Sequence, residues 1–256
     1  MKLAFTGKGG VGKTSISAAL SLYLASVGKK VLAVDVDPDA NLATALGMPF
    51  EEAKNIEPIS HMRELVKERT GAEPGAAPGF FTLNPKVDDI PEKYSKDING
   101  VKLMVMGSIE SGGGGCICPE NSLTRALIKN LLIERNEVVV LDMEAGIEHL
   151  GRSTAEAVDA MLVVIEPGQR SIETAKRIKS LASEIGIQRL YLILNKVDDE
   201  KQLELAKRID MPLLAVISND LNLKKADQED KAVYPLDEKF DSEIKDLADK
   251  LIKQNL

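Results

Sequence analysis

Residues 7–14 have the sequence G-K-G-G-V-G-K-T, which matches the phosphate-binding pattern G-x-x-x-x-G-K-[ST]. An apolar run at residues 3–5 precedes the glycines, and residues 15–27 carry apolar side chains at helical spacing. A strand, a glycine loop and a helix N-terminus in this order direct backbone N–H groups at an anion. We therefore predict a nucleotide site in which Lys13 reaches the β- and γ-phosphates and Thr14 binds Mg²⁺. The residues expected to contact the nucleotide in this loop are Gly9, Gly10, Val11, Gly12, Lys13, Thr14 and Ser15.

Three carboxylates follow predicted strands and could serve the same site. Asp35 and Asp37 come at the end of the apolar run 31–35, and Asp142 ends the run 138–142. In a parallel sheet, side chains at the carboxyl ends of the strands line the crevice where ligands bind. An apolar strand that ends in aspartate is typical of a Walker B motif, so Asp142 is expected to hold Mg²⁺-bound water. Phosphoryl transfer depends mainly on positioning and charge neutralisation, so one carboxylate beside the attacking water is sufficient.

Two cysteines, Cys116 and Cys118, follow four consecutive glycines and lie just before Pro119. Thiolates are favoured near a helix N-terminus, whereas an ordinary free cysteine is buried and inert. One C-x-C pair supplies too few ligands for a tetrahedral site, but two chains related by a two-fold axis supply four. We therefore predict a metal site shared across a dimer interface, although two ordinary thiols are the alternative. Four thiolates suit Ni²⁺, Zn²⁺, Cu(I) or an iron–sulfur cluster.

The composition limits the classes of protein to which the chain can belong. Its 256 residues are 44% hydrophobic and 29% charged, which supports a sizeable core and argues against overall disorder. The formal net charge of −7 gives no general footprint for nucleic acid, and no apolar stretch is long enough to span a membrane. Two cysteines one residue apart cannot form a disulfide framework. We expect a cytoplasmic protein that binds neither nucleic acid nor a membrane.

Strand and helix patterns alternate along the chain. The runs expected as strands are 2–6, 31–35, 101–106, 138–142, 161–165, 190–194 and 213–217. The segments expected as helices are 15–27, 61–69, 120–135, 172–185, 203–209 and 241–254. This alternation predicts an α/β fold with a doubly wound, mostly parallel sheet and helices on both faces, as in P-loop NTPases.

We expect a single ATPase domain over residues 1–256, with an irregular insertion at about 70–100. Within that insertion, residues 80–83 are expected to form a short strand. The charge run at 224–231 is expected to be a solvated loop or the end of a helix.

Lys8 places a second lysine in the phosphate loop, so residues 8–14 resemble the deviant Walker A motif of the ParA/MinD/nitrogenase-iron-protein class of ATPases. The resemblance implies that Lys8 crosses a dimer interface to the partner's nucleotide, so that ATP binding drives dimerisation. It also implies that Asp37 positions the attacking water and that Asp35 helps to hold Mg²⁺.

The same resemblance extends to positions farther along the chain. Asn195 and Lys196 follow a predicted strand, and in this class the asparagine of such a pair recognises adenine. Ser218 stands where relatives often have proline, on the second wall of the adenine pocket. Gly146, soon after Asp142, matches a switch II glycine whose backbone moves in response to the γ-phosphate.

With the loop and the cysteines considered together, the chain resembles the CooC family, the maturation ATPases of nickel carbon monoxide dehydrogenase. The resemblance rests on segments spread through most of the sequence, at 7–14, 35–41, 83–88, 116–122, 145–150 and 165–167. It implies a homodimer, switched by ATP and ADP, that binds Ni²⁺ or Zn²⁺ at its paired cysteines. The implied client is carbon monoxide dehydrogenase or the related acetyl-CoA synthase, into which the dimer assists nickel insertion.

Two other functions share the same ATPase core. A ParA/MinD-like positioning protein would need a basic DNA-binding surface or a membrane-binding tail, and neither is evident in the sequence. An electron donor like the nitrogenase reductase would hold a [4Fe–4S] cluster between subunits. Its relatives take the cluster ligands from two separated cysteines per chain, which this chain lacks.

Overall fold

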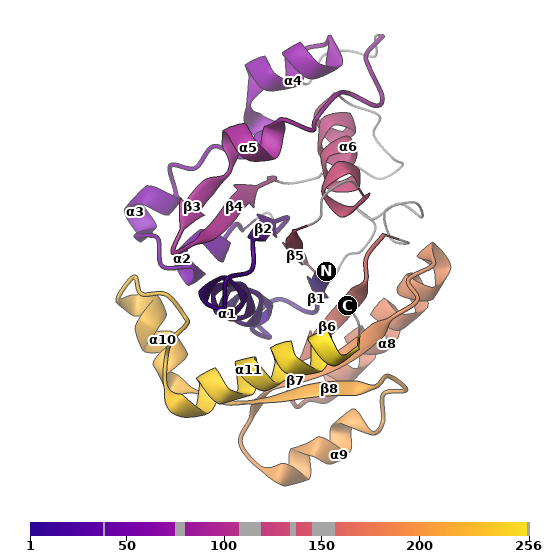
Figure 1. The fold of residues 1–256 in the computed structure, drawn as a ribbon. Helices are drawn as coiled ribbons and strands as arrows, with labels where there is room; N and C mark the ends of the chain where they lie inside the picture. The colour runs from indigo at the N-terminus through magenta and orange to yellow at the C-terminus, as the bar shows by residue number, and fades with distance from the viewer. Residues whose placement is uncertain (38, 75–79, 108–118, 134–136, 145–156, 255–256) are drawn as a thin grey trace.

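The computed structural model describes residues 1–37, 39–74, 80–107, 119–133, 137–144 and 157–254, which surround one central sheet (Figure 1). The sheet has eight strands in the order β3-β4-β2-β5-β1-β6-β7-β8. Its strands are β1 (Lys2–Thr6), β2 (Val31–Asp35), β3 (Lys96–Ile98), β4 (Val101–Val105), β5 (Val138–Asp142), β6 (Ala160–Ile165), β7 (Leu190–Val197) and β8 (Leu213–Ser218). Every neighbouring pair is parallel except β3 with β4, which confirms the predicted mostly parallel sheet.

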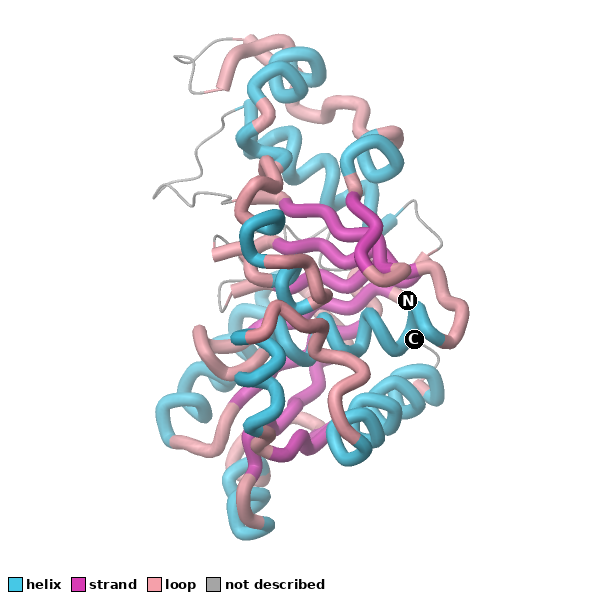
Figure 2. The backbone as a smooth tube through the Cα atoms, turned by 90° about the vertical axis from the view of Figure 1, so that its left-hand side faces the viewer, coloured by secondary structure: helices cyan, strands magenta, loops and turns pink. Residues whose placement is uncertain are grey.

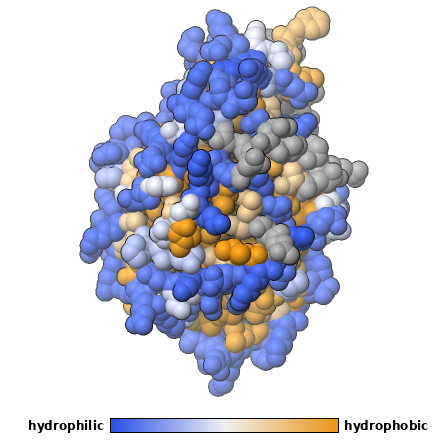
Figure 3. Space-filling view, in the orientation of Figure 1, coloured by the Kyte–Doolittle hydropathy of each residue, from blue (hydrophilic) through white to orange (hydrophobic). Residues whose placement is uncertain are grey.

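Helices cover both faces of this sheet, as the tube view in Figure 2 shows. The longer ones are α1 (Lys13–Ser26), α4 (Arg63–Thr70), α6 (Pro119–Ile133), α8 (Gln169–Ile185), α10 (Leu221–Gln228) and α11 (Glu238–Lys253). The short ones are α2 (Leu42–Ala45), α3 (Phe50–Ala53), η1 (Ile59–His61), α5 (Ile90–Tyr94), η2 (Glu200–Gln202) and α9 (Leu203–Ala206). Hydrophilic residues predominate on the face shown in Figure 3, with some apolar residues among them. Most of the large apolar side chains are buried in two clusters between the sheet and its helices.

Alternating side chains of the strands enter two separate cores. In β1, Leu3 and Phe5 pack in the core formed with α1 and α11, whereas Ala4 packs in the core formed with α4, α6 and α8. Successive strand residues point to opposite faces, so a strand covered on both sides must be apolar throughout. This requirement explains why the apolar runs in the sequence located the central strands correctly.

The C-terminal helix shows how local sequence sets an element's boundary. Asp237 accepts hydrogen bonds from the backbone N–H groups of Lys239 and Phe240, both at 3.1 Å, and so caps the start of α11. The helix therefore begins three residues earlier than the predicted range 241–254. Its apolar face is buried against α1 and β8, which confirms that it docks on the core.

The stretch at 70–100 differs from its expected irregular form, because it contains α5 and the edge strand β3. The predicted strand at 80–83 is wrong, since these residues have no strand structure. Phe80 and Leu83 are exposed, and no strand among the described residues pairs with this segment. The β-propensity of these residues alone therefore does not produce a strand. The predicted helix 203–209 is shorter than expected, because α9 ends at Ala206. In the charge run 224–231, α10 occupies the first five residues.

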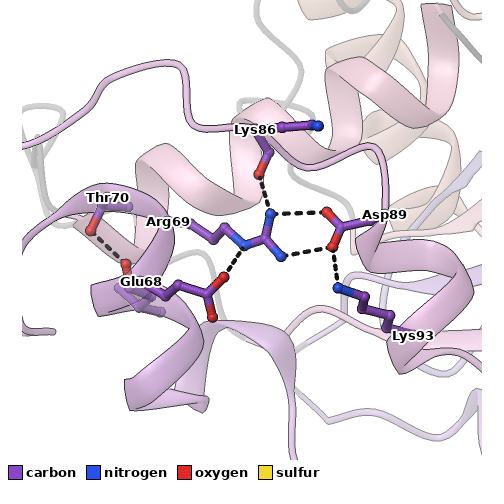
Figure 4. Close-up of polar contacts among 7 residues, drawn as sticks. Glu68, Arg69, Thr70, Lys86, Asp89 and Lys93 are labelled. Atoms are coloured by element: carbon purple, nitrogen blue, oxygen red, sulfur yellow. Dashed lines mark hydrogen bonds and ion pairs between the residues drawn. The ribbon is translucent and has the colours of Figure 1, made fainter.

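An ion-pair network fastens α4 to the residues that lead into α5 (Figure 4). The Arg69 guanidinium donates to both carboxylate oxygens of Asp89, at 2.9 and 2.8 Å, and also to the carbonyl of Lys86. Lys93 contacts the same carboxylate at 2.7 Å, and together these cations hold the pKa of Asp89 well below its usual range. A bidentate arginine–carboxylate pair fixes the relative orientation of the two side chains as well as their contact. This network therefore holds the end of α4 against the start of α5.

Candidate nucleotide site

The phosphate loop lies between β1 and α1 and requires glycine at two positions. Gly7 has a φ of +151°, and a Cβ atom there would lie 2.2 Å from the carbonyl oxygen of Val164. Gly12 has a φ of +92°, and its Cβ would lie 2.2 Å from the Asn195 side-chain nitrogen. Gly12 is also the N-cap of α1 and provides no side-chain acceptor. The first amide groups of α1 therefore have no side-chain cap, as a helix that binds an anion requires.

Lys13 directs a buried ammonium toward the carboxylates of the site. The residue is only 5% exposed, and its Nζ lies 4.0 Å from the Asp37 carboxylate. Asp37 follows β2 and is itself mostly buried, with an exposed side-chain fraction of 15%. The structure thus brings together a cation and a carboxylate that the sequence predicted at the phosphates.

Asp35 and Asp142 are adjacent at the carboxyl ends of β2 and β5, where they pair in register. Both are fully buried. The Asp35 carboxylate accepts hydrogen bonds from the backbone N–H groups of Asp37 at 3.1 Å and Leu42 at 2.9 Å. Neither oxygen of Asp142 has a hydrogen-bond partner among the residues that the structure describes.

Burial raises the pKa values of both carboxylic acids. The pKa of Asp35 rises to about 7, and the neighbouring charge of Asp142 adds to the effect of burial. The pKa of Asp142 rises to about 6, although the nearby Thr14 hydroxyl and Lys13 ammonium oppose the shift. Two buried carboxylates beside a hydroxyl are the oxygen donors that Mg²⁺ prefers, and unpartnered oxygens such as those of Asp142 are costly without a cation. These residues therefore fit a Mg²⁺ ion.

A cleft of about 710 Å³ opens beside the loop, within the usual size of a small-molecule site. Its phosphate end is formed by the loop glycines, Lys13, Thr14 and Asp37. The opposite wall comes from the end of β8 and from α10. The residues that line this wall are Ser218, Asn219, Asp220, Leu223, Lys224 and Asp227.

Asn195 and Lys196 line the cleft and also contact the backbone of the phosphate loop. The Asn195 side-chain nitrogen donates to the carbonyl of Val11 at 2.7 Å. The Lys196 ammonium donates to the carbonyl of Gly10 and lies 3.3 Å from the Glu166 carboxylate. The sequence predicted nucleotide contacts for this pair, and the structure shows that both side chains also contact the loop itself.

Ser218, predicted beside the adenine, is fixed by the C-terminal helix. Its backbone N–H and its hydroxyl donate to the two carboxylate oxygens of Glu243, at 2.9 and 2.6 Å. Beyond it, Asp220 accepts a hydrogen bond at 2.7 Å from the backbone N–H of Asn222 and caps α10. The wall of the cleft is thus built on α10 and α11.

The remaining predicted residues lie away from the cleft or outside the described structure. Lys8 is exposed and makes no ion pair within the described part of the chain. Cys116, Cys118 and Gly146 lie outside the described residues, so the predicted metal site and switch glycine remain predictions. Among the described residues, no group of three or more histidine, cysteine or acidic side chains could hold a metal ion, and no helix could span a membrane.

Sequence reasoning missed several residues of the cleft. Glu144 lies only two residues after the predicted Asp142, and its carbonyl accepts a 2.7 Å hydrogen bond from the Thr6 hydroxyl at the end of β1. Asp220 follows a predicted strand by three residues, so its position at a carboxyl end was an available signal. Lys224 gave no such signal, because it lies in a charge run that was expected to be a solvated loop or the end of a helix.

A family model described as the CobQ/CobB/MinD/ParA nucleotide binding domain matches residues 3–233. The chain therefore belongs to this family of nucleotide-binding proteins. Within it, the chain is 48% identical over 240 residues to the carbon monoxide dehydrogenase accessory protein CooC of Rhodospirillum rubrum, covering 92% of this chain and 90% of that protein. It is also 45% identical over 258 residues to an ATP-binding protein of Methanocaldococcus jannaschii, covering 99% of this chain and 98% of the relative.

Solved structures confirm the predicted P-loop NTPase fold. The MinC:MinD cell division complex of Aquifex aeolicus contains a chain with a TM-score of 0.70 and 19% identity, covering 99% of this chain and 96% of that one. A ParA family ATPase of Chlorobium tepidum has a TM-score of 0.70 and 20% identity, covering 96% and 97%. The fold and the relatives together define an ATPase of the MinD/ParA class, and they confirm the resemblance to CooC.

Proposed function

We propose that this ATPase is a nucleotide-switched homodimer that delivers nickel to carbon monoxide dehydrogenase, or to the related acetyl-CoA synthase. The observation that carries the proposal is the 48% identity to CooC over 92% of the chain. The C-x-C pair at Cys116 and Cys118, which follows four consecutive glycines in the sequence, adds a means of carrying the metal. Nickel is the cargo in this proposal, and Zn²⁺ is the other ion that four thiolates would hold.

Hydrolysis follows from the charges gathered at the phosphate end of the cleft. The loop amides and Lys13 would neutralise the β- and γ-phosphates. Thr14, Asp35 and Asp142 are the residues that would hold Mg²⁺, Thr14 directly and the two carboxylates through water. Mg²⁺ supplies charge neutralisation between the phosphates when it is bound. In this proposal Asp37 positions the attacking water, and its carboxylate, 4.0 Å from the Lys13 ammonium, supports that role.

Two parts of the chain connect ATP to the dimer and to the metal. Lys8 is exposed on the loop, where its side chain could reach the nucleotide of a partner subunit. The helix α6 begins at Pro119, directly after the cysteines, and leads into β5, which ends at Asp142. In this proposal α6 and β5 transmit a change in nucleotide at Asp142 to the cysteines, and linkage requires that ATP and metal then affect each other's affinity.

Metal titration of the Cys116→Ser/Cys118→Ser variant tests this proposal. We expect wild-type protein to bind one Ni²⁺ per dimer, with proton release and weaker binding at acid pH, because thiolates must be deprotonated. The double variant should lose that binding while its affinity for ADP stays unchanged, which serves as the internal control for folding. Stoichiometric Ni²⁺ binding by the double variant would refute the metal role.

The absorption spectrum of the anaerobically purified dimer separates the proposal from an iron–sulfur reductase. Nickel–thiolate charge transfer supports the proposal, and broad iron–sulfur bands contradict it.

A further inference from the structure

We infer that Glu166 and Lys196 are positioning residues for nucleotide binding, which act by holding the phosphate loop in its anion-binding shape. The inference rests on the proposed nucleotide site and assigns a role to Glu166, which no step of hydrolysis uses. Glu166 directly follows β6, and Lys196 lies near the end of the adjacent strand β7. The Lys196 ammonium contacts the Glu166 carboxylate at 3.3 Å and the carbonyl oxygen of Gly10.

Two consecutive carbonyls of the loop are held by two consecutive side chains. Lys196 donates a hydrogen bond to the carbonyl of Gly10, and Asn195 donates one to the carbonyl of Val11 at 2.7 Å. A carbonyl oxygen that turned toward a phosphate would repel it, whereas the site needs N–H groups there. Because both carbonyls are bound by donors from β7, neither is free to turn toward the nucleotide.

The backbone of β7 is distorted in a way that makes this double contact feasible. Successive side chains of a regular strand point to opposite faces, so neighbours cannot normally reach the same loop. Lys196 instead has a φ of +57°, in the left-handed region, and the pairing of β7 with β8 shifts register between Leu194 and Val197. A lysine in this conformation carries strain that the structure keeps, and such strain concentrates at functional sites.

The role of Glu166 is to keep the lysine in place. The Lys196 and Glu166 side chains are 40% and 41% exposed, so an unpaired lysine would be free to leave the loop for solvent. The ion pair holds the Lys196 side chain in one geometry, which lowers the entropic cost of its contact with the loop. Glu166 therefore acts through Lys196 and needs no contact with the nucleotide.

The sign of the Glu166→Gln effect distinguishes this inference from direct contact between Lys196 and the nucleotide. If Lys196 bound the nucleotide directly, removal of a competing carboxylate would leave ADP affinity unchanged or strengthen it. If Lys196 acts through the loop, the same change weakens ADP binding, by about threefold. Lys196→Met should weaken it by about tenfold, as expected for loss of a charged hydrogen bond. The double variant should be no weaker than Lys196→Met alone.

A glycine variant separates positioning from stability. Lys196→Gly relieves the left-handed strain, so its melting temperature should equal or exceed that of Lys196→Met, while its ADP affinity should be reduced to the same extent. Lys179→Met is the matched control, because Lys179 is 41% exposed and likewise pairs with both a carboxylate and a carbonyl, those of Asp210 on the surface. It should leave ADP affinity unchanged.

Calorimetric titration with Mg²⁺ and ADP measures all of these variants, with Lys13→Ala as the reference for the site itself. Unchanged ADP binding in Lys13→Ala would overturn the proposed nucleotide site. If Lys13→Ala loses ADP binding, the nucleotide site stands. Wild-type ADP affinity in Lys196→Met, or unchanged or stronger affinity in Glu166→Gln, would then overturn only the positioning role. Reduced affinity in both, with no added loss in the double variant, supports it.

Discussion

Replacing Asp142 with asparagine should stabilise the nucleotide-free chain while abolishing its Mg²⁺-dependent hydrolysis. Asp142 is fully buried beside Asp35, without a hydrogen-bond partner for either oxygen among the described residues. Its pKa is raised from 3.8 to about 6, chiefly by burial. At about 1.36 kcal/mol per pKa unit, ionisation of this group costs the folded chain about 3 kcal/mol. A buried amide also needs hydrogen-bond partners, so the variant recovers only part of this cost. We expect the free energy of unfolding of Asp142→Asn to exceed that of wild type by about 1–3 kcal/mol at pH 8.

The pH dependence of this gain identifies its cause. The folded-state pKa of Asp142 lies above the ordinary value of 3.8, so the wild-type chain loses this contribution to stability as the pH rises from 3.8 through about 6. The asparagine side chain in Asp142→Asn does not titrate in this pH range. The difference in free energy of unfolding between the variant and wild type should therefore be largest at pH 8 and shrink toward about pH 4.

Urea denaturation without Mg²⁺ or nucleotide, followed by circular dichroism at both pH values, measures this difference. Asp35→Asn is the matched control, because both Asp35 oxygens accept backbone hydrogen bonds and an amide would set one N–H against another. It should gain less than Asp142→Asn or lose stability. If Asp142→Asn were less stable than wild type at pH 8, the buried Asp142 carboxylate would not destabilise the folded chain as described here.

Two further variants separate the steps of the ATP cycle. Lys8→Ala should retain ADP binding, because Lys8 does not line its own cleft, but should lose ATP-driven dimerisation and hydrolysis. Sedimentation with ATP checks this, and an unaltered dimer would exclude the cross-interface role. Asp37→Asn should bind ATP and dimerise but stop cleavage, because the water loses its positioning carboxylate. Normal phosphate release by this variant would place that carboxylate elsewhere.

The position of the loop between β1 and α1, and of the carboxylates at strand ends, could be predicted from the sequence, because each depends on neighbours close in the chain. The glycines at 7 and 12 permit the loop's backbone, and Asp35 and Asp142 end strands whose apolar runs are unmistakable. Parallel pairing of β2 with β5 then places the two carboxylates side by side. A rule about strand ends was thus enough to locate this part of the site.

Contacts between distant segments could not be predicted in the same way. The pairing of Lys196 with Glu166, and the contact of Asn195 with Val11, depend on strand order and on a left-handed residue that no local pattern indicated. The strand expected at 80–83 failed for the opposite reason. Its residues suit a strand, but in the described structure they pair with neither edge of the sheet.

The most direct test of the proposed function is the mass and metal content of the Asp37→Asn protein with Mg²⁺, ATP and Ni²⁺. Because this variant should hold ATP without cleaving it, sedimentation with metal analysis reports the ATP-bound state alone. We predict a dimer with one Ni²⁺ per two chains, and with ADP a loss of the dimer or of its affinity for Ni²⁺. A protein that stays monomeric with ATP, or binds Ni²⁺ identically with either nucleotide, would contradict a nucleotide-switched carrier.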